Sequence, residues 1–434
     1  MLVATGLATS GLALAGCLGD DDSEETPTLE LDETELLTVA DIDVSERPDL
    51  LPVDVETEHV EAGRERVRSF LAAIPDTFAD EIPNEAVRLE IDEFREDARQ
   101  ALESSEEATD PESVLSAIRR ARRDAATAEG MYAVVTEDYS RNDVFEWAAD
   151  VRTELEAVDE GLERTGDDVE SVVLVYEQIE RWLRSSRMSV TDHIERIAPA
   201  ASEVEAVREA THSVEMAAAQ LDDAIHLHEQ LSTATNFDET LQKSAETLVE
   251  ERSERAADLP EERAEFVDFG IGSVSTDPVD TLLRLTRRDV ESVGDRIEDG
   301  QLAWAARQAH RFTLRLETLD RIEARFSEEP LAVPDDANDV AAAKRDAIQA
   351  VEPLQENVGD SPLFDVGFDE AIGYIQYGDN RLERIREESL DVSESVRGAG
   401  YVFGALLSYH VAIEIAEVLP DVTDTVVDVF ETSG

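Results

Sequence analysis

Prolines are so widely spaced in this chain that the sequence favours a fold of long helices. No proline lies between Pro111 and Pro199, and none lies between Pro199 and Pro260. A proline inside a helix removes a hydrogen bond and clashes with the preceding turn, so these intervals leave room for uninterrupted helices. Asp110-Pro111 and Asp277-Pro278 each place a capping carboxylate before a proline in the first turn. We therefore predict that a helix begins at each of these pairs.

Apolar residues recur with helical spacing along most of the chain, and no segment shows sustained alternation of apolar and polar residues. Only Leu29 to Val55 is ambiguous and could contain extended pieces. Short links between long helices favour antiparallel neighbours. We predict an all-α fold of long antiparallel helices in one or two helical bundles. The expected helices cover 57–73, 84–105, 111–138, 142–164, 168–188, 201–233, 237–257, 278–298, 301–327, 336–357, 367–388, 396–419 and 421–431.

The segment from Asp258 to Thr276 is the best candidate for a domain boundary. It reads "DLPEERAEFVDFGIGSVST", with one proline, two glycines and no helical stripe. The size of the chain also suggests more than one unit. We predict a helical domain over 57–258 and a second helical domain over 277–434.

The predicted helix 396–419 differs from the others because it is apolar on nearly all sides. Small residues recur every fourth position, at Gly400, Gly404, Ser408, Ala412 and Ala416. Such a helix is expected at the buried centre of a bundle, and the polar His410, Glu414 and Glu417 argue against a membrane span. His410 and Glu414 lie one turn apart and form one candidate site, the alternative being a hydrogen-bonded core histidine.

The first sixteen residues carry no charge and lead to the only cysteine, Cys17. An uncharged run of this length is typical of the apolar region of an export signal. The stretch "LAGC" that ends at Cys17 resembles the lipobox of twin-arginine lipoprotein signals of haloarchaea. That resemblance implies removal of residues 1–16, a lipid on Cys17 and an arginine pair encoded upstream of Met1. Residues 17–56 are then a lipidated acidic tether and irregular lead-in, in which about a dozen flexible residues would span roughly 20 Å.

Acidic residues dominate the composition, with 103 Asp and Glu against 38 Lys and Arg and a net charge of -65. Because 42% of the residues are hydrophobic, disorder does not explain this charge. Molar salt shortens the Debye length to about 3 Å and makes such self-repulsion tolerable. Only Lys243 and Lys344 are lysines, and scarce lysine with excess acid resembles the signature of haloarchaeal proteomes. Nucleic acid would be repelled.

The predicted helix 201–233 carries the second candidate site. Its apolar stripe is flanked by Glu209, His212, Glu215, Asp222 and His226. His and carboxylate side chains three or four residues apart converge, so a metal site could form there. Glu56-x-x-His59 repeats the Glu-x-x-His spacing. Because acids occupy so many positions, a solvated or hydrogen-bonded flank is the competing interpretation, and we assign no metal ligands and no cofactor; bound cations would be nonspecific.

Three classes of function remain for a lipid-anchored protein on the extracellular face of the cell membrane. We favour a helical binding or scaffold module, because no phosphate loop, nucleophile elbow or zinc signature is present. The first alternative is a solute- or metal-binding lipoprotein that uses the His and carboxylate clusters. The second is an enzyme with two carboxylates as acid and base, although no catalytic residue can be assigned. The expected partners are the membrane, through the lipid on Cys17, and a surface protein or small solute.

Overall fold

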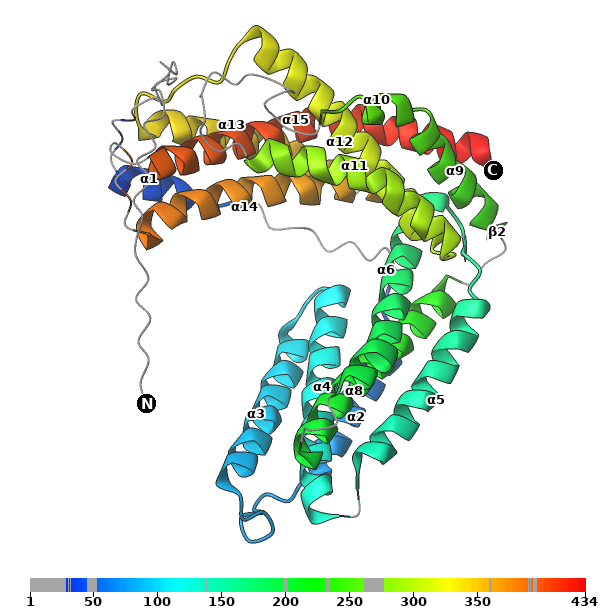
Figure 1. Cartoon of the computed structure of the whole chain (residues 1–434). Helices are drawn as coiled ribbons and strands as arrows, with labels where there is room; N and C mark the ends of the chain where they lie inside the picture. The colour runs from blue at the N-terminus through cyan, green and yellow to red at the C-terminus, as the bar shows by residue number, and fades with distance from the viewer. Residues whose placement is uncertain are drawn as a thin grey trace, which may run out of the picture.

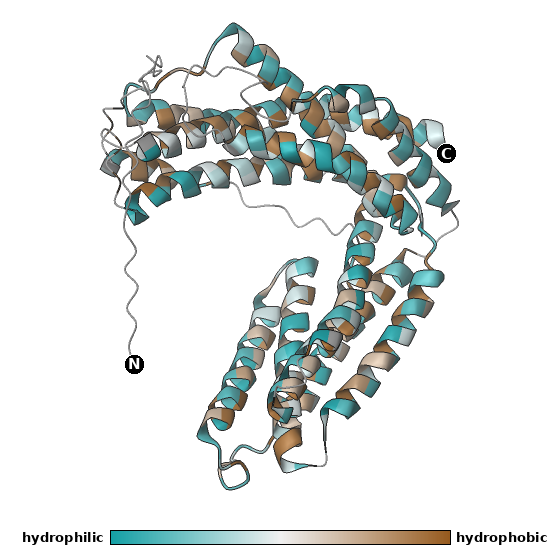
Figure 2. Ribbon diagram, in the orientation of Figure 1, coloured by the Kyte–Doolittle hydropathy of each residue, from teal (hydrophilic) through white to brown (hydrophobic). Residues whose placement is uncertain are grey.

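The structure is a computed structural model, and it describes residues 29, 31, 33–44, 53–137, 139–197, 202–231, 235–260, 277–358, 361–388, 390, 392 and 396–434 (Figure 1). Over these residues the chain is all-α, as predicted. Besides helices they contain one short antiparallel ladder, in which β1 (Thr165–Gly166) pairs with β2 (Thr235–Asn236). Figure 2 shows hydrophilic residues along the outer sides of the helices, as expected for helices that bury one apolar face.

The first bundle is built from α2 to α8. The predicted helix starts are confirmed there, because Asp110 accepts a hydrogen bond from the Ser113 amide and Asp168 accepts one from the Ser171 amide. A π-helical turn follows α6. The elements are α2 (Thr57–Ala73), α3 (Glu85–Glu107), α4 (Pro111–Thr136), α5 (Arg141–Glu160), α6 (Val169–Met188), the π-helical turn (Ser189–His193), α7 (Ile194–Arg196) and α8 (Glu203–Gln230).

The second bundle contains the remaining helices and the short N-terminal helix α1. Its predicted start at Asp277-Pro278 is confirmed, since α11 begins at Asp277. The elements are α1 (Glu33–Ala40), α9 (Asp238–Glu250), α10 (Ser253–Ala257), α11 (Asp277–Glu298), α12 (Leu302–Glu328), α13 (Ala337–Val358), a 3₁₀ turn (Pro362–Phe364), α14 (Asp365–Glu387) and α15 (Val396–Ser433).

The predicted limit of the first domain at residue 258 is about twenty residues too late. Helix α9 packs against α12 and α15, so it belongs to the second bundle. Its buried Leu241, Ala245 and Leu248 contribute to that core. The proline and glycines after residue 258 suggested a linker, but the bundle to which a helix belongs is decided by the partner of its apolar face. The predicted boundary segment falls largely outside the described residues.

The predicted helix 396–419 ends before Pro420, and this end is wrong. Helix α15 continues to Ser433 with Pro420 inside it. The continuation is stabilised by packing, because Val422, Val426 and Phe430 are buried and α15 contacts α9. By length and composition α15 could cross a membrane, but 89% of its most apolar window is buried inside the structure. Its position is that of a central bundle helix, as predicted for 396–419.

The predicted irregular lead-in contains a helix, α1, which is fixed to the second bundle by a buried lysine. Leu36 and Val39 of α1 are buried against α13 and α14. Lys344, which is 0% exposed, donates to the carbonyl oxygens of Val39 and Ala40 at 2.9 Å each. Its charge is balanced by Asp379 at 2.9 Å. The N-terminal end of the described chain is therefore attached to the second bundle, although the first bundle follows it in sequence.

Helix α6 joins the two bundles, because it packs on α8 of the first and on α12 of the second (Figure 1). Glu180 of α6 accepts hydrogen bonds from the amides of Ala303 and Trp304, at 3.2 and 2.8 Å, and so caps α12. Arg164 holds Glu180 at 2.9 Å and also donates to the carbonyl oxygen of Gly300. The connection between the bundles thus includes a buried ion pair at a helix N-terminus.

Candidate functional site

A cavity of about 380 Å³ lies in the first bundle between α2, α4 and α8. Its wall carries charges of both signs and two imidazoles, contributed by His59, Arg66, Arg122, Asp222, His226 and Glu229. The apolar part of the wall includes Leu115, Ile118 and Ile225. Two of the predicted site residues, Asp222 and His226, therefore face one cavity.

The spacing of polar residues on α4 and α8 explains why they meet. On α8, Glu215, Asp222 and His226 recur at intervals of seven and four residues, which keeps them on one side of the helix. On α4, Arg119 and Arg122 are three residues apart and share a face. Because α4 and α8 pack along each other, the arginines of one helix meet the acids of the other.

Glu215 is held by two arginines from two different helices. Arg66 of α2 donates to both of its carboxylate oxygens at 2.7 Å, and the Nε of Arg122 donates to Oε1 at 2.7 Å. Glu215 is 0% exposed. Arg122 also reaches Asp222 at 2.7 Å, and although burial alone would lower the pKa of Arg122, these two carboxylates raise it above its usual value. Glu215 therefore links α8 to α2 and α4 through buried ion pairs.

His59 and His226 stack face to face beside the cavity, with ring centroids 4.2 Å apart. His59 is oriented by Asp223, which lies 2.7 Å from its Nε2 and also accepts from Arg119 at 2.6 Å. The Nε2 of His226 accepts from the backbone amide of Glu56 at 3.2 Å. Burial and the neighbouring His59 keep the pKa of His226 below its usual value, which favours a neutral ring.

The other two predicted residues of α8 lie apart from this cavity. Glu209 is half exposed and its carboxylate is 3.5 Å from Arg208. Burial and the charge of Arg123 lower the pKa of His212 to about 4, so its ring is neutral near pH 7. Of the residues predicted along this side of α8, Asp222 and His226 line the cavity, whereas Glu209 and His212 do not.

His410 and Glu414 share α15 but do not form the predicted pair. Glu414 is held by Arg321 and Arg325 of α12, at 3.0 and 2.6 Å. His410 meets the ring of Phe326 edge-on, and its Nδ1 has no hydrogen-bond partner among the described residues. Burial and the charge of Arg325 lower its pKa to about 4. This histidine is a partly buried neutral residue, and its Nδ1 lacks the hydrogen bond that the alternative interpretation expected.

The two buried acids near the cavity are held by arginines. Asp223 accepts from Arg119 and His59, and Glu215 accepts from Arg66 and Arg122. In the part of the chain that the structure describes, no group of three or more His, Cys, Asp or Glu side chains is placed to hold a metal ion. Cys17, the predicted lipid attachment residue, lies outside the described residues.

The arginines that organise this site are not among the residues predicted from the sequence. Arg119 and Arg122 belong to the run "RRARR" that follows the Asp110-Pro111 cap, and Arg66 lies between Arg64 and Arg68 in α2. The run is a usable signal, because Arg119 and Arg122 lie one turn after the buried Leu115 and Ile118, and a buried arginine requires an acidic partner. Asp223 was also missed, since it follows Asp222 and nothing in the sequence distinguishes the two.

Comparisons with known proteins agree with the division into two bundles. Residues 58–236 match a family model described as "Domain of unknown function (DUF8262)", and residues 238–428 match one described as "Domain of unknown function (DUF8264)". No curated protein and no solved structure matches the chain. The two family models meet at residue 237, immediately before α9, where the contacts change from the first bundle to the second.

Proposed function

We propose that this chain is a lipid-anchored binding module on the outer surface of a halophilic archaeal cell, and that the first-bundle cavity binds a small zwitterionic solute. The observation that carries this proposal is a single cavity of about 380 Å³ whose wall holds guanidinium, carboxylate and imidazole groups. Small-molecule pockets typically measure about 300–1,000 Å³. A metabolite of amino-acid size therefore fits the space.

The charges on the wall specify the chemistry of the solute. Arg66 and Asp222 form ion pairs with Glu215 and Arg122, yet their side chains remain 42% and 49% exposed. Each can therefore make a further interaction. A carboxylate on the solute would receive hydrogen bonds from Arg66, and an ammonium group would face Asp222. An aliphatic side chain would pack on the apolar part of the wall, so an aliphatic amino acid such as L-leucine matches all three requirements.

The arrangement favours binding over acid-base catalysis. The buried carboxylates next to the cavity, Glu215 and Asp223, each accept hydrogen bonds from an arginine, so their oxygen atoms already have partners within the protein. The imidazole of His59 is fixed by Asp223, and that of His226 by a backbone amide. These contacts are suited to holding a polar ligand in one orientation.

The attachment of α1 to the second bundle indicates which end of the protein would lie near the membrane. Figure 1 shows α1 at the end of the second bundle that is remote from α6. A lipid on Cys17 would place this end of the second bundle near the membrane, within the reach of the tether. The first bundle, with its cavity, would then project away from the lipid surface toward the medium.

Replacement of Cys17 by serine tests the anchor. Since stable attachment depends on the lipid, the Cys17→Ser protein, expressed in a halophilic host from its chromosomal locus, should move from the membrane fraction to the medium. Immunoblotting of membranes and medium, with mass spectrometry of the N-terminal peptide, measures the change. Retention of the variant in membranes at the level of the natural protein would contradict lipid anchoring.

Transfer to low salt tests the halophilic assignment. With a net charge of -65, self-repulsion grows as the Debye length increases from about 3 Å at molar salt to about 10 Å at 0.1 M. We expect the purified protein to lose most of its helical far-UV circular dichroism signal during dialysis and to regain it when potassium chloride is restored. An unchanged spectrum at low salt would show that the fold does not depend on screening.

Isothermal titration calorimetry with L-leucine in molar potassium chloride tests the cavity. We expect saturable binding with a Kd between micromolar and millimolar. Ala62 is exposed on α2 and lines the cavity, so a phenylalanine there should occupy the entrance and weaken binding by more than about tenfold. Ala72 is exposed on the same helix and does not line the cavity.

The variant Ala72→Phe is therefore the matched control, and it should bind L-leucine like the natural sequence. Equal losses in Ala62→Phe and Ala72→Phe would place the effect on helix α2 as a whole and overturn the assignment of the cavity. Absence of binding to the natural sequence across the proteinogenic amino acids would overturn the proposed ligand class.

A further inference from the structure

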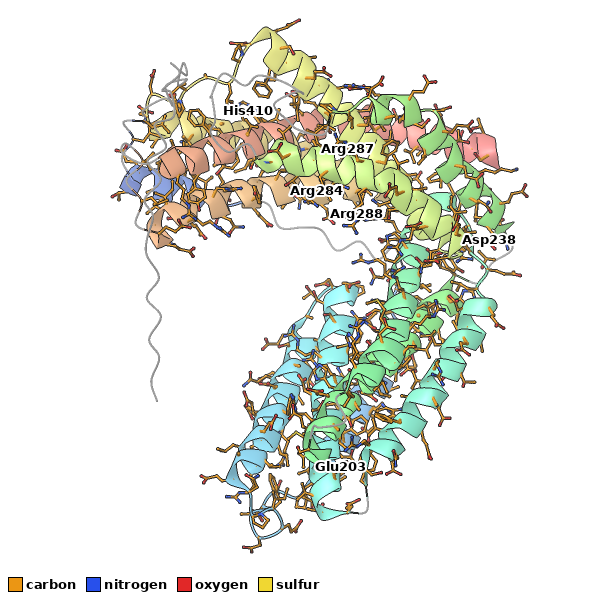
Figure 3. The ribbon with its side chains drawn as sticks, viewed as in Figure 1. Glu203, Asp238, Arg284, Arg287, Arg288 and His410 are labelled. Carbon is orange, nitrogen blue, oxygen red and sulfur yellow. The ribbon has the colours of Figure 1, made fainter. Side chains whose placement is uncertain are left out.

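Two histidines hold the start of helix α2 against helix α8 at the wall of the first-bundle cavity. His59 of α2 and His226 of α8 both line the cavity, and their rings are parallel within 2° at a centroid distance of 4.2 Å. His226 lies near the C-terminal end of α8, far along the helix from Glu203, which Figure 3 labels at its start. The stacked pair is therefore at the end of the first bundle where the chain passes to the second.

The hydrogen bonds of the pair define which nitrogen of each ring carries a proton. The Nε2 of His226 accepts from the backbone amide of Glu56, the residue before the first turn of α2, at 3.2 Å. Since an amide N–H can only donate, the neutral ring of His226 carries its proton on Nδ1. The Nε2 of His59 lies 2.7 Å from the carboxylate of Asp223, which accepts, so this nitrogen is the donor. Both contacts join α2 to α8.

Protonation of His226 is incompatible with this arrangement. A proton on its Nε2 would place two donors, the imidazolium and the Glu56 amide, against each other, and the hydrogen bond between them would be lost. The positive ring would also face His59 across the stack with little water to screen it, since His226 is 7% exposed. Relief requires the Glu56 backbone or the His226 ring to move, and either movement separates the start of α2 from α8.

The charges around His226 have opposing effects on this protonation. The titratable and charged groups near it are Glu56 and His59 of α2, Asp223 and Glu229 of α8 and, on the rest of the cavity wall, Asp222, Arg66 and Arg122. The acids favour an imidazolium, but Asp223 is already held by Arg119 of α4 at 2.6 Å. Burial and His59 outweigh the acids, so the pKa of His226 lies below its usual value of 6.5.

We propose that the stacked pair makes the first-bundle cavity pH-sensitive, so that acidification releases the start of α2 from α8 and weakens binding of the solute. The released form binds a proton that the closed form excludes. The closed form therefore keeps its full stability above the usual histidine pKa of 6.5 and loses it progressively as pH falls below that value. The weakening of binding rests on the function proposed above, whereas the release of α2 can be measured without a ligand.

Hydrogen exchange of the full chain in molar potassium chloride measures the release of α2. The peptide that contains Glu56 is compared at pH 7.5 and pH 5, with each rate divided by the chemical exchange rate at that pH. We expect its protection factor to fall about tenfold at pH 5, the change expected for one lost hydrogen bond. His226→Gln keeps an acceptor for the Glu56 amide and does not titrate, so its protection factor should be the same at both pH values.

His228→Asn is the matched control, because it removes a histidine of the same helix that does not line the cavity. Burial lowers the pKa of His228 too, and its Nδ1 bonds to the Tyr176 hydroxyl at 2.9 Å, a contact that asparagine can keep. Circular dichroism at pH 7.5 verifies that both variants fold. Protection that is independent of pH in the natural sequence, a response that persists in His226→Gln, or a response lost in His228→Asn would each overturn the proposal.

Calorimetric titration with L-leucine at the same two pH values measures the effect on the cavity. L-leucine keeps both of its charges between pH 5 and pH 7.5, so a change in affinity comes from the protein. We expect its Kd to rise at least about threefold at pH 5 in the natural sequence and to stay constant in His226→Gln. A constant Kd in the natural sequence would overturn the regulation of the site. Absence of binding at both pH values would overturn the solute site itself, while the exchange response would still decide the release of α2.

Discussion

Replacement of Glu180 by alanine is expected to lower the free energy of unfolding by about 3–5 kcal/mol at pH 8, the range found when one partner of a buried ion pair is removed. Glu180 is 3% exposed and Arg164 is 7% exposed. Without the carboxylate, the guanidinium would keep mainly carbonyl partners, and the amides of Ala303 and Trp304 would lose their cap. Chemical denaturation in molar salt, followed by circular dichroism, measures the change.

The same residue predicts a pH dependence. Burial raises the pKa of Glu180 to about 7 from a model-peptide value of 4.5, against the opposing effect of Arg164. Between these values the folded chain binds more protons than the unfolded chain, so the stabilisation that comes from protonation of Glu180 is present at low pH and is lost as pH rises through about 7. A shift of this size corresponds to about 3 kcal/mol.

Glu180→Gln is the control for both effects, since the amide fills the same space and does not titrate. The difference in unfolding free energy between the natural sequence and Glu180→Gln should therefore change between pH 4.5 and pH 7, in the direction of a relatively less stable natural sequence at the higher pH. Parallel stability curves across this interval would show that Glu180 does not titrate there.

Replacement of Glu215 by alanine is the second change with a large expected effect, again about 3–5 kcal/mol of unfolding free energy. This carboxylate is 0% exposed and receives hydrogen bonds from Arg66 of α2 and Arg122 of α4. Its removal would leave Arg122, which is 4% exposed, with the half-exposed Asp222 as its one remaining acidic partner among the described residues. Denaturant unfolding in molar salt provides the measurement.

Asp222→Ala is the matched control, because it removes another carboxylate from the same guanidinium. Asp222 is 49% exposed, and partly exposed pairs contribute about 0–1 kcal/mol. If Glu215→Ala and Asp222→Ala lower the free energy of unfolding equally, burial does not determine the strength of these ion pairs. The double variant Glu215→Leu with Arg122→Leu should recover much of the loss, since well-packed apolar residues can replace a buried ion pair.

Features of the fold could be predicted where the residues that determine them are close together in the sequence. Asp110 and Asp168 cap their helices through atoms only a few residues away, so their effect is legible in the sequence. Helix α1 was missed because it is short and is held by Lys344, a residue about three hundred positions later. The continuation of α15 through Pro420 likewise depends on burial of Val426 and Phe430 rather than on local preference.

The part of the candidate site that lies on a single helix could be predicted from the sequence. The flank of α8 contains Glu215, Asp222 and His226, and helical spacing brings these residues to one side. What these acids contact was not predictable, because 103 acids and 38 basic residues allow far too many pairings. The packing of three helices brings Arg66 and Arg122 to Glu215. Part of the flank that was a candidate metal site is therefore a buried ion-pair cluster beside a charged cavity.

Competition for labelled L-leucine bound to the full chain in molar potassium chloride tests the proposed zwitterion site most directly. Isoamylamine lacks the carboxylate that Arg66 would hold, and isocaproate lacks the ammonium group that Asp222 would face. Since each loses one charge-assisted interaction, each should compete at least about tenfold more weakly than unlabelled L-leucine. Competition by either analogue as strong as that of L-leucine would contradict recognition of both charges in the first-bundle cavity.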